Sequence, residues 1–130
     1  MATILIIDDS ASMIAFLRQT LEGAGYVVTA ASDGKAGLAR MRAQAFDLVI
    51  TDLYMPEVDG IETITRARDA RLVSRLIAIS SSDSLVDLLP AARLLGAQRT
   101  LHKPFAAADL LAAVQAVLRL PPAAQAPRAT

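Results

Sequence analysis

Cysteine is absent from this chain of 130 residues, which excludes a disulfide scaffold, cysteine-ligated zinc and thiol catalysis. Neither charge is in excess, because thirteen basic residues balance thirteen acidic ones. The composition therefore gives no support for direct binding to nucleic acid or to a membrane. No apolar run approaches the ~20 residues that a membrane-spanning helix needs. A strand-like run begins within a few residues of Met1, so we expect no signal peptide and a cytoplasmic protein.

Lysine and histidine are scarce as well. Eleven of the thirteen basic residues are arginines, and the only lysines are Lys35 and Lys103. Lys103 is therefore unusual in this chain, because it places a compact ammonium group at the end of a strand-like run. This makes Lys103 a candidate phosphate ligand. The ordinary alternative is a surface lysine. The single histidine, His102, is interpreted as a packed or surface residue rather than a ligand.

Five strand-like apolar runs alternate with five helical patterns. This alternation predicts a doubly wound α/β domain, with a five-stranded parallel sheet and helices on both of its faces. We expect one domain over residues 1–119. Residues 120–130 are rich in proline and alanine and lack a periodic apolar face, which is typical of a disordered tail or a truncated linker. The expected strands are residues 3–8, 26–30, 47–52, 76–80 and 98–102.

Capping residues indicate where the helices begin and end. Ser10 is a good N-cap for the first helix, and Gly23 and Gly25 are expected to end it. The pairs Asp33-Gly34 and Asp59-Gly60 open the second and third helices. The last helix has apolar residues at helical spacing: Leu110, Leu111, Val114, Val117 and Leu118.

The fourth helix contains a proline in an otherwise helical composition. An interior proline costs roughly 3 kcal/mol, whereas one at the first helical position is tolerated. We therefore expect a short helix that starts near Leu89 or Pro90, after a longer loop. Arginines crowd the end of the third helix, and they are interpreted as a solvated face, with docking to an acidic partner as the minor alternative. These arginines are Arg66, Arg68, Arg71 and Arg75.

Three carboxylates follow two of the buried strands. Asp8 and Asp9 come directly after the first apolar run, and Asp52 ends the third. The carboxyl ends of parallel strands are where α/β folds place their ligands. Carboxylates gathered there repel one another and stay ionised at neutral pH only beside a cation. Oxygen ligands with this charge suit Mg²⁺, so the sequence predicts a site that handles phosphate.

Asp52 is the candidate nucleophile, because a carboxylate can attack phosphorus and form an aspartyl phosphate. Such a transfer depends mostly on positioning and on neutralisation of charge. Ser80, at the end of the fourth strand, is a weaker candidate that would donate its hydroxyl to a phosphate oxygen. The ordinary alternative for each of these residues is a helix cap or a solvent-facing loop position.

Taken in chain order, these residues and their neighbours resemble the receiver domain of two-component response regulators. The resemblance runs from about residue 3 to residue 119 and implies a flavodoxin-like sheet of strand order 2-1-3-4-5. In that order the first and third strands are neighbours, which brings the three carboxylates to one crevice. The matching residues are Asp8-Asp9, Asp52, Met55-Pro56, Asp59-Gly60, Ser80 and Lys103-Pro104-Phe105.

The resemblance implies a magnesium-dependent phosphoacceptor rather than an enzyme that turns over substrates. Asp52 is expected to take its phosphoryl group from a sensor histidine kinase or a histidine phosphotransfer protein and to regulate a downstream partner. Asp9, Asp52 and the backbone carbonyl of Tyr54 are the expected direct Mg²⁺ ligands, with Asp8 acting largely through water. Lys103 would pair with the phosphate, and the peptide bond between Lys103 and Pro104 is expected to be cis.

The resemblance also bears on how phosphorylation is read out. Ser80 matches the hydroxyl that moves to bind the phosphate. The position three before Lys103 often holds an aromatic residue in this family, but it is Thr100 here. The signal is therefore expected to travel through the segment between Ser80 and Pro90. A homodimer through the fourth helix, fifth strand and fifth helix is a further expectation.

Two other classes of protein remain as alternatives. An aspartyl-phosphate phosphatase or phosphotransferase acting on small molecules would need a second acid or a cap insertion near the nucleophile, and Tyr54 without an insertion argues against it. A flavoprotein that binds FMN on the same fold would need a phosphate loop rich in glycine and hydroxyls after the first strand. This chain has Asp8-Asp9 there.

Overall fold

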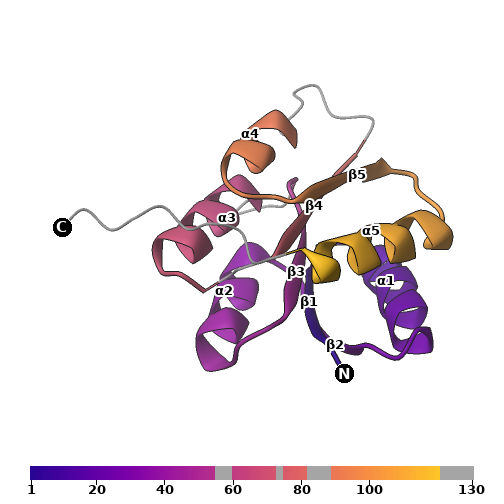
Figure 1. Ribbon diagram of the computed structural model, residues 1–130. Helices are drawn as coiled ribbons and strands as arrows, with labels where there is room; N and C mark the ends of the chain where they lie inside the picture. The colour runs from indigo at the N-terminus through magenta and orange to yellow at the C-terminus, as the bar shows by residue number, and fades with distance from the viewer. Residues whose placement is uncertain (55–59, 73–74, 82–88, 121–130) are drawn as a thin grey trace.

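The fold alternates strands and helices along the whole chain (Figure 1). The computed structural model describes residues 1–54, 60–72, 75–81 and 89–120. Its elements in chain order are β1 Thr3–Ile7, α1 Ala11–Gly23, β2 Val27–Ala31, α2 Gly34–Ala43, β3 Leu48–Asp52, α3 Gly60–Asp69, β4 Leu76–Ser81, α4 Leu89–Leu94, β5 Arg99–Lys103 and α5 Ala107–Arg119.

The five strands form one parallel sheet in the order β2-β1-β3-β4-β5. The predicted fold class and strand order are therefore confirmed. In the register of the sheet, Ile7 of β1 lies beside Thr51 of β3. The carboxyl ends of these two central strands consequently meet, and Asp8, Asp9 and Asp52 lie at this point.

Helices cover both faces of the sheet because the strands are apolar on both faces. Successive residues of β1 point to opposite faces, so Ile4 and Ile6 pack toward α1 and α5, whereas Leu5 and Ile7 pack toward α2 and α3. All four side chains are buried. Figure 1 shows α1 and α5 on one side of the sheet and α2, α3 and α4 on the other.

The predicted helix starts agree with the structure. The Ser10 hydroxyl accepts the backbone N–H of Met13 at 3.3 Å and caps α1, and the Asp33 carboxylate accepts the N–H of Ala36 at 2.7 Å and caps α2. The short helix α4 begins at Leu89 with Pro90 in its first turn, as the proline predicted. Residues 82–88, where the longer loop was expected, lie outside the described residues.

Each of the five strands differs from expectation by one residue at one or both ends. β2 begins at Val27 rather than at residue 26, because the N–H of Tyr26 bonds to the carbonyl of Leu21 at 3.1 Å and so belongs to the end of α1. Helix α5 ends at Arg119 and residues 121–130 are outside the described part, so the domain boundary after residue 119 and the tail stay predictions. Within that part, each helix is too short or too polar to cross a membrane.

Candidate functional site

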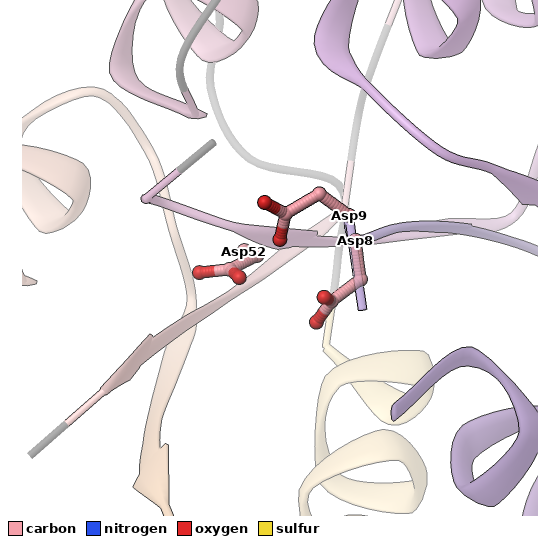
Figure 2. A group of neighbouring side chains, drawn as sticks. All are labelled: Asp8, Asp9 and Asp52. Atoms are coloured by element: carbon pink, nitrogen blue, oxygen red, sulfur yellow. The ribbon is translucent and has the colours of Figure 1, made fainter. Parts of the chain in front are cut away.

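Three carboxylates meet at the carboxyl edge of the sheet (Figure 2). Asp8 and Asp9 follow β1, and Asp52 is the last residue of β3. Their carboxylate oxygens lie within 4.8 Å of one another. Asp8 and Asp52 are buried, whereas Asp9 is exposed at the mouth of the cluster. The adjacency of β1 and β3 therefore brings together the residues that the sequence singled out.

Lys103, at the end of the edge strand β5, links the two buried carboxylates. It ends β5, and its Nζ donates to Oδ2 of Asp8 at 3.1 Å and to Oδ2 of Asp52 at 3.2 Å. Burial disfavours the charged ammonium, but the neighbouring charges of Asp52 and Asp8 outweigh that effect, so the pKa of Lys103 is raised above its ordinary value. The lysine is thus held firmly in its charged form.

Burial of Asp8 disfavours its charged form. Its side chain is 0% exposed, and this burial raises the pKa of Asp8 above its ordinary value. Repulsion from Asp52 acts in the same direction, while the Ser10 N–H at 2.8 Å and the Lys103 ammonium act against it. The site therefore lacks enough positive charge to stabilise all of its carboxylates, which is the condition that favours a bound cation.

Backbone groups fix the orientation of Asp52. Its Oδ1 accepts the N–H of Tyr54 at 3.1 Å, while its Oδ2 accepts from Lys103. The hydroxyl of Thr51 donates to the backbone carbonyl of Asp52 at 2.9 Å. Each carboxylate oxygen thus has a donor of its own, so the nucleophile faces the cluster in a defined geometry.

Gly60 allows α3 to begin directly behind this strand end. Its N–H bonds to the carbonyl of Leu53 at 3.2 Å. A Cβ atom at this position would overlap the carbonyl oxygen of Asp52 and the Cα of Leu53. Only glycine fits this close approach, so the glycine of the Asp59-Gly60 pair supports the backbone of the nucleophile.

The remaining candidates lie around the cluster. Ser80 is buried on β4, one residue beyond Ile79, which is the partner of Asp52 in the sheet. The side chain of Tyr54 packs against the core on the α2 and α3 face. The Lys103–Pro104 peptide bond is cis, as expected. Met55-Pro56 and Asp59 lie outside the described residues.

Sequence reasoning missed the backbone contributors to this site. The N–H groups of Ser10 and Tyr54 hold Asp8 and Asp52, but a backbone donor leaves no mark on residue identity. Gly60 was identified from the sequence as part of the Asp59-Gly60 pair, although its steric role was not visible there. Thr100 accepts a hydrogen bond from Arg93 of α4 at 3.1 Å, so the residue that replaces the aromatic links α4 to β5.

The arrangement has a definite chemistry. Three carboxylates offer only hard oxygen ligands, and the exposed position of Asp9 leaves the cluster accessible to a hydrated cation. This donor set could hold a divalent metal ion, and it does not suit a soft metal. The nearby ammonium of Lys103 would meet an incoming oxyanion beside Asp52. Phosphate chemistry at a carboxylate is the reaction that these groups support.

Comparison with known proteins agrees with this geometry. The family described as "Response regulator receiver domain" matches residues 4–115. The chain is 34% identical over 116 residues to the alkaline phosphatase synthesis transcriptional regulatory protein PhoP of Bacillus subtilis, covering 89% of this chain and 48% of that protein. It is 34% identical over 122 residues to response regulator ArlR of Staphylococcus epidermidis, covering 94% of this chain and 55% of ArlR. The chain thus spans about half the length of these relatives.

Solved structures show the same fold. Chemotaxis protein CheY4 of Vibrio cholerae superposes with a TM-score of 0.82 and 31% identity, covering 90% of this chain and 98% of CheY4. A CheY-like receiver domain protein of Methanospirillum hungatei gives a TM-score of 0.84 and 29% identity, covering 91% of this chain and 94% of that one. With its strand order, its acidic cluster and a family match over residues 4–115, this chain belongs to the response regulator receiver domains of two-component systems.

Proposed function

We propose that Asp52 is the phosphoacceptor of this receiver domain. The observation that carries the proposal is the lysine bridge: Lys103 Nζ contacts both Asp8 and Asp52 beside a third carboxylate at the strand ends. An ammonium group already in contact with Asp52 is positioned to pair with a phosphoryl group after its transfer. Asp52 is buried to 4% exposure, so the acyl phosphate would be shielded from much of the bulk water.

The transfer forms one bond and breaks one bond. A carboxylate oxygen of Asp52 attacks phosphorus, and the bond between phosphorus and the donor atom breaks, with its electron pair leaving on the donor. With a histidine kinase or a histidine phosphotransfer protein, that donor atom is an imidazole nitrogen. The Tyr54 N–H and the Lys103 ammonium hold the two Asp52 oxygens before attack. Hydrolysis of the acyl phosphate by water returns the free carboxylate, so the domain acts only on its own phosphorylation state.

The carboxylate cluster fits Mg²⁺. Asp8, Asp9 and Asp52 supply oxygen ligands only, within 4.8 Å of one another, and burial, with repulsion from Asp52 as a lesser cause, raises the pKa of Asp8. We propose Asp9, Asp52 and the backbone carbonyl of Tyr54 as direct ligands, with Asp8 acting through water. When bound, Mg²⁺ neutralises charge on the carboxylates and on the phosphoryl oxygens.

Ser80 and the segment after it are the proposed readout. Ser80 is buried on the adjacent strand, one residue beyond the partner of Asp52. From there its hydroxyl could move to donate a hydrogen bond to a phosphoryl group on Asp52. The segment between Ser80 and Pro90 would then carry the change, because Thr100 offers no ring to move. Residues 82–88 of this segment are outside the described part of the chain.

The proposed partners are a sensor histidine kinase or a phosphotransfer protein upstream, and a protein or output domain downstream. A homodimer through α4, β5 and α5 is proposed on the surface features of that face. Leu94 on α4 is 84% exposed, and a groove runs between β5 and α5. Sedimentation of the protein with a phosphate mimic would show a dimer that Leu94→Ser weakens, and a monomer under all conditions would exclude it.

Intact-mass measurement tests the proposed phosphoacceptor. Wild-type protein incubated with a small phosphodonor and Mg²⁺ should gain one phosphoryl group, and Asp52→Asn should gain none, because an amide keeps the shape but loses the nucleophilic charge. Asp33→Asn is the matched control, since asparagine still caps α2 and the cluster is untouched. Equal labelling of Asp52→Asn would refute the assignment.

Metal binding is tested separately by calorimetric titration of Mg²⁺. Asp9→Ala should lose most of the affinity, because Asp9 is the accessible ligand of the cluster. A second reading comes from protection of the protein against thermal unfolding, which Mg²⁺ should give to wild type and not to Asp9→Ala. Undiminished affinity in Asp9→Ala would remove Asp9 from the ligand set.

A further inference from the structure

Three helices of this protein end in the same hydrogen-bonded turn. In each, the residue after the cap adopts a positive φ, its N–H bonds three residues back, and the next N–H bonds five residues back, which is the Schellman pattern. In α1 and α4 the positive-φ residue is glycine, with φ of 95° at Gly25 and 108° at Gly96. In α3 it is Arg71, with φ of 56°.

Arg71 is therefore an arginine at a glycine position. In the left-handed region the Cβ of any other residue crowds the following carbonyl oxygen, which glycine avoids. Among the described residues, Arg71 is the only one besides glycine with a positive φ. The helix dipole favours a cation here, but Arg66 and Arg68 already occupy the last turn of α3. Stability alone thus gives little reason for a third arginine in a strained conformation, and such an outlier points to a use of its side chain.

The topology places four other arginines at the same edge of the sheet as Arg71. Helices that follow parallel strands end at the edge opposite the strand carboxyl ends, and α2 and α3 lie side by side (Figure 1). The arginine edge is the set at the ends of α2 and α3 and at the start of β4: Arg40, Arg42, Arg68, Arg71 and Arg75.

Among the described residues, the arginine edge forms no ion pair with a carboxylate. The ion pairs found within residues 1–54, 60–72, 75–81 and 89–120 join Arg18 to Glu22, Arg66 to Glu62, and Lys103 to Asp8 and Asp52, and none includes the arginine edge. Arg75 is held in place by a hydrogen bond from its Nε to the Leu120 carbonyl at 3.2 Å, which reduces the entropy lost on binding a ligand.

We propose that the arginine edge docks an acidic polypeptide segment, with Arg71 as a central contact. Guanidinium groups bind carboxylates in a two-pronged geometry that lysine cannot supply, and this edge is built from arginine alone. A polypeptide fits better than a nucleic acid, because the chain has no net charge to attract a polyanion over distance. Exposed Asp47 and Asp69 at the same edge would also repel a continuous phosphate backbone, whereas spaced carboxylates can avoid them. The proposal is independent of phosphorylation at Asp52.

Fluorescence anisotropy with a short labelled peptide of alternating glutamate and glycine provides the test. Wild type should bind it at low salt, and added salt should weaken the binding. Arg71→Gly should weaken binding about three- to fivefold, the range for one exposed ion pair, while raising the midpoint of thermal unfolding. Arg71→Ala should weaken binding equally without raising that midpoint, because alanine keeps the strain. A residue with a merely structural role would not separate binding from stability in this way.

Lys35→Gln is the matched control, because it removes one exposed positive charge from the first turn of α2, at the opposite edge of the sheet. It should leave peptide affinity unchanged. The proposal is overturned if wild type does not bind the peptide, if Arg71→Gly binds it as wild type does, or if Lys35→Gln weakens binding as much. Tighter binding of a single-stranded oligonucleotide of equal charge would replace the acidic polypeptide with nucleic acid as the partner.

Discussion

The two edges of the sheet differ in the sign of their charges and in how those charges are paired. At the carboxyl edge, Asp8 and Asp52 are buried and share one ammonium group from Lys103. At the other edge, the five residues of the arginine edge lie at the ends of α2 and α3 and at the start of β4, and within the described residues no ion pair joins them to a carboxylate. A net charge of zero thus conceals a division between a compact negative site and a spread positive surface.

This difference has an energetic consequence. Charges removed from water are expensive unless they are paired and hydrogen-bonded, so the carboxyl edge should respond strongly to substitution and to pH. Arg40, Arg42 and Arg71 are exposed, and exposed charges are solvated in both the folded and the unfolded protein, so these residues of the arginine edge should respond weakly. A bound cation would relieve the unfavourable burial of the carboxylates at the carboxyl edge. The arginine edge, in contrast, is available to bind a partner.

The largest effect is expected at Gly60, where the carboxyl edge has no room for an added atom. Gly60→Ala should lower the free energy of unfolding by about 3 kcal/mol, because the new methyl group overlaps the backbone of Asp52 and Leu53. Gly23→Ala is the control, since nothing lies within 4 Å of a Cβ built there. Urea titration of both variants measures the difference. Equal stability of the two variants would mean that α3 can shift away from the site.

A smaller loss is expected when the lysine bridge is removed. Lys103→Met should lower the free energy of unfolding by about 2 kcal/mol at neutral pH, because two buried carboxylates then lack their common cation. The folded pKa of Lys103 lies above its ordinary value of 10.5. Its contribution is therefore fully present below pH 10.5 and is lost as pH rises through the folded pKa. Urea titrations across alkaline pH should show wild type converging on Lys103→Met.

Removing the charge of Asp8 should raise the free energy of unfolding, whereas removing the charge of Lys103 lowers it. Its folded pKa is raised above the ordinary value of 3.8, so the folded protein holds the proton more tightly than the unfolded chain does. Burial of the charged form thus destabilises wild type once pH has risen through that raised pKa. Asp8→Asn should increase the free energy of unfolding at neutral pH, and the gain should vanish below pH 3.8. A gain that is independent of pH would show that packing, rather than charge, is responsible.

The fold could be predicted because its determinants are local. Apolar runs, capping residues such as Ser10 and Asp33, and the position of Pro90 each act over a few residues, and each agrees with the structure. The strand order is not local, and it came from the resemblance. The one-residue shift of β2 arose because the N–H of Tyr26 is used by the end of α1, a hydrogen bond that residue types do not reveal.

The candidate site divides in the same way. The sequence identified the charged side chains, because acidic residues at the ends of apolar strands are distinctive. It did not show that Lys103 contacts both Asp8 and Asp52, since that bridge depends on side-chain reach across two strands. Nor did it show that Arg71 has a positive φ, because an arginine after a helix gives no sign of a left-handed backbone, whereas a glycine does.

The smallest effect is expected at the arginine edge, and it is the sharpest test of the contrast between the edges. The double variant Arg40→Gln/Arg42→Gln removes two charges from the last turn of α2. Its free energy of unfolding should stay within about 0.5 kcal/mol of wild type, since exposed charges at a helix end contribute little beyond a screened dipole interaction. The difference should also stay constant between acidic and neutral pH, because arginine does not titrate there. Urea titration at two salt concentrations measures both. A loss above about 1 kcal/mol that persists at high salt would mean that the arginines pack as structural elements, and the functional interpretation of this edge would then fail.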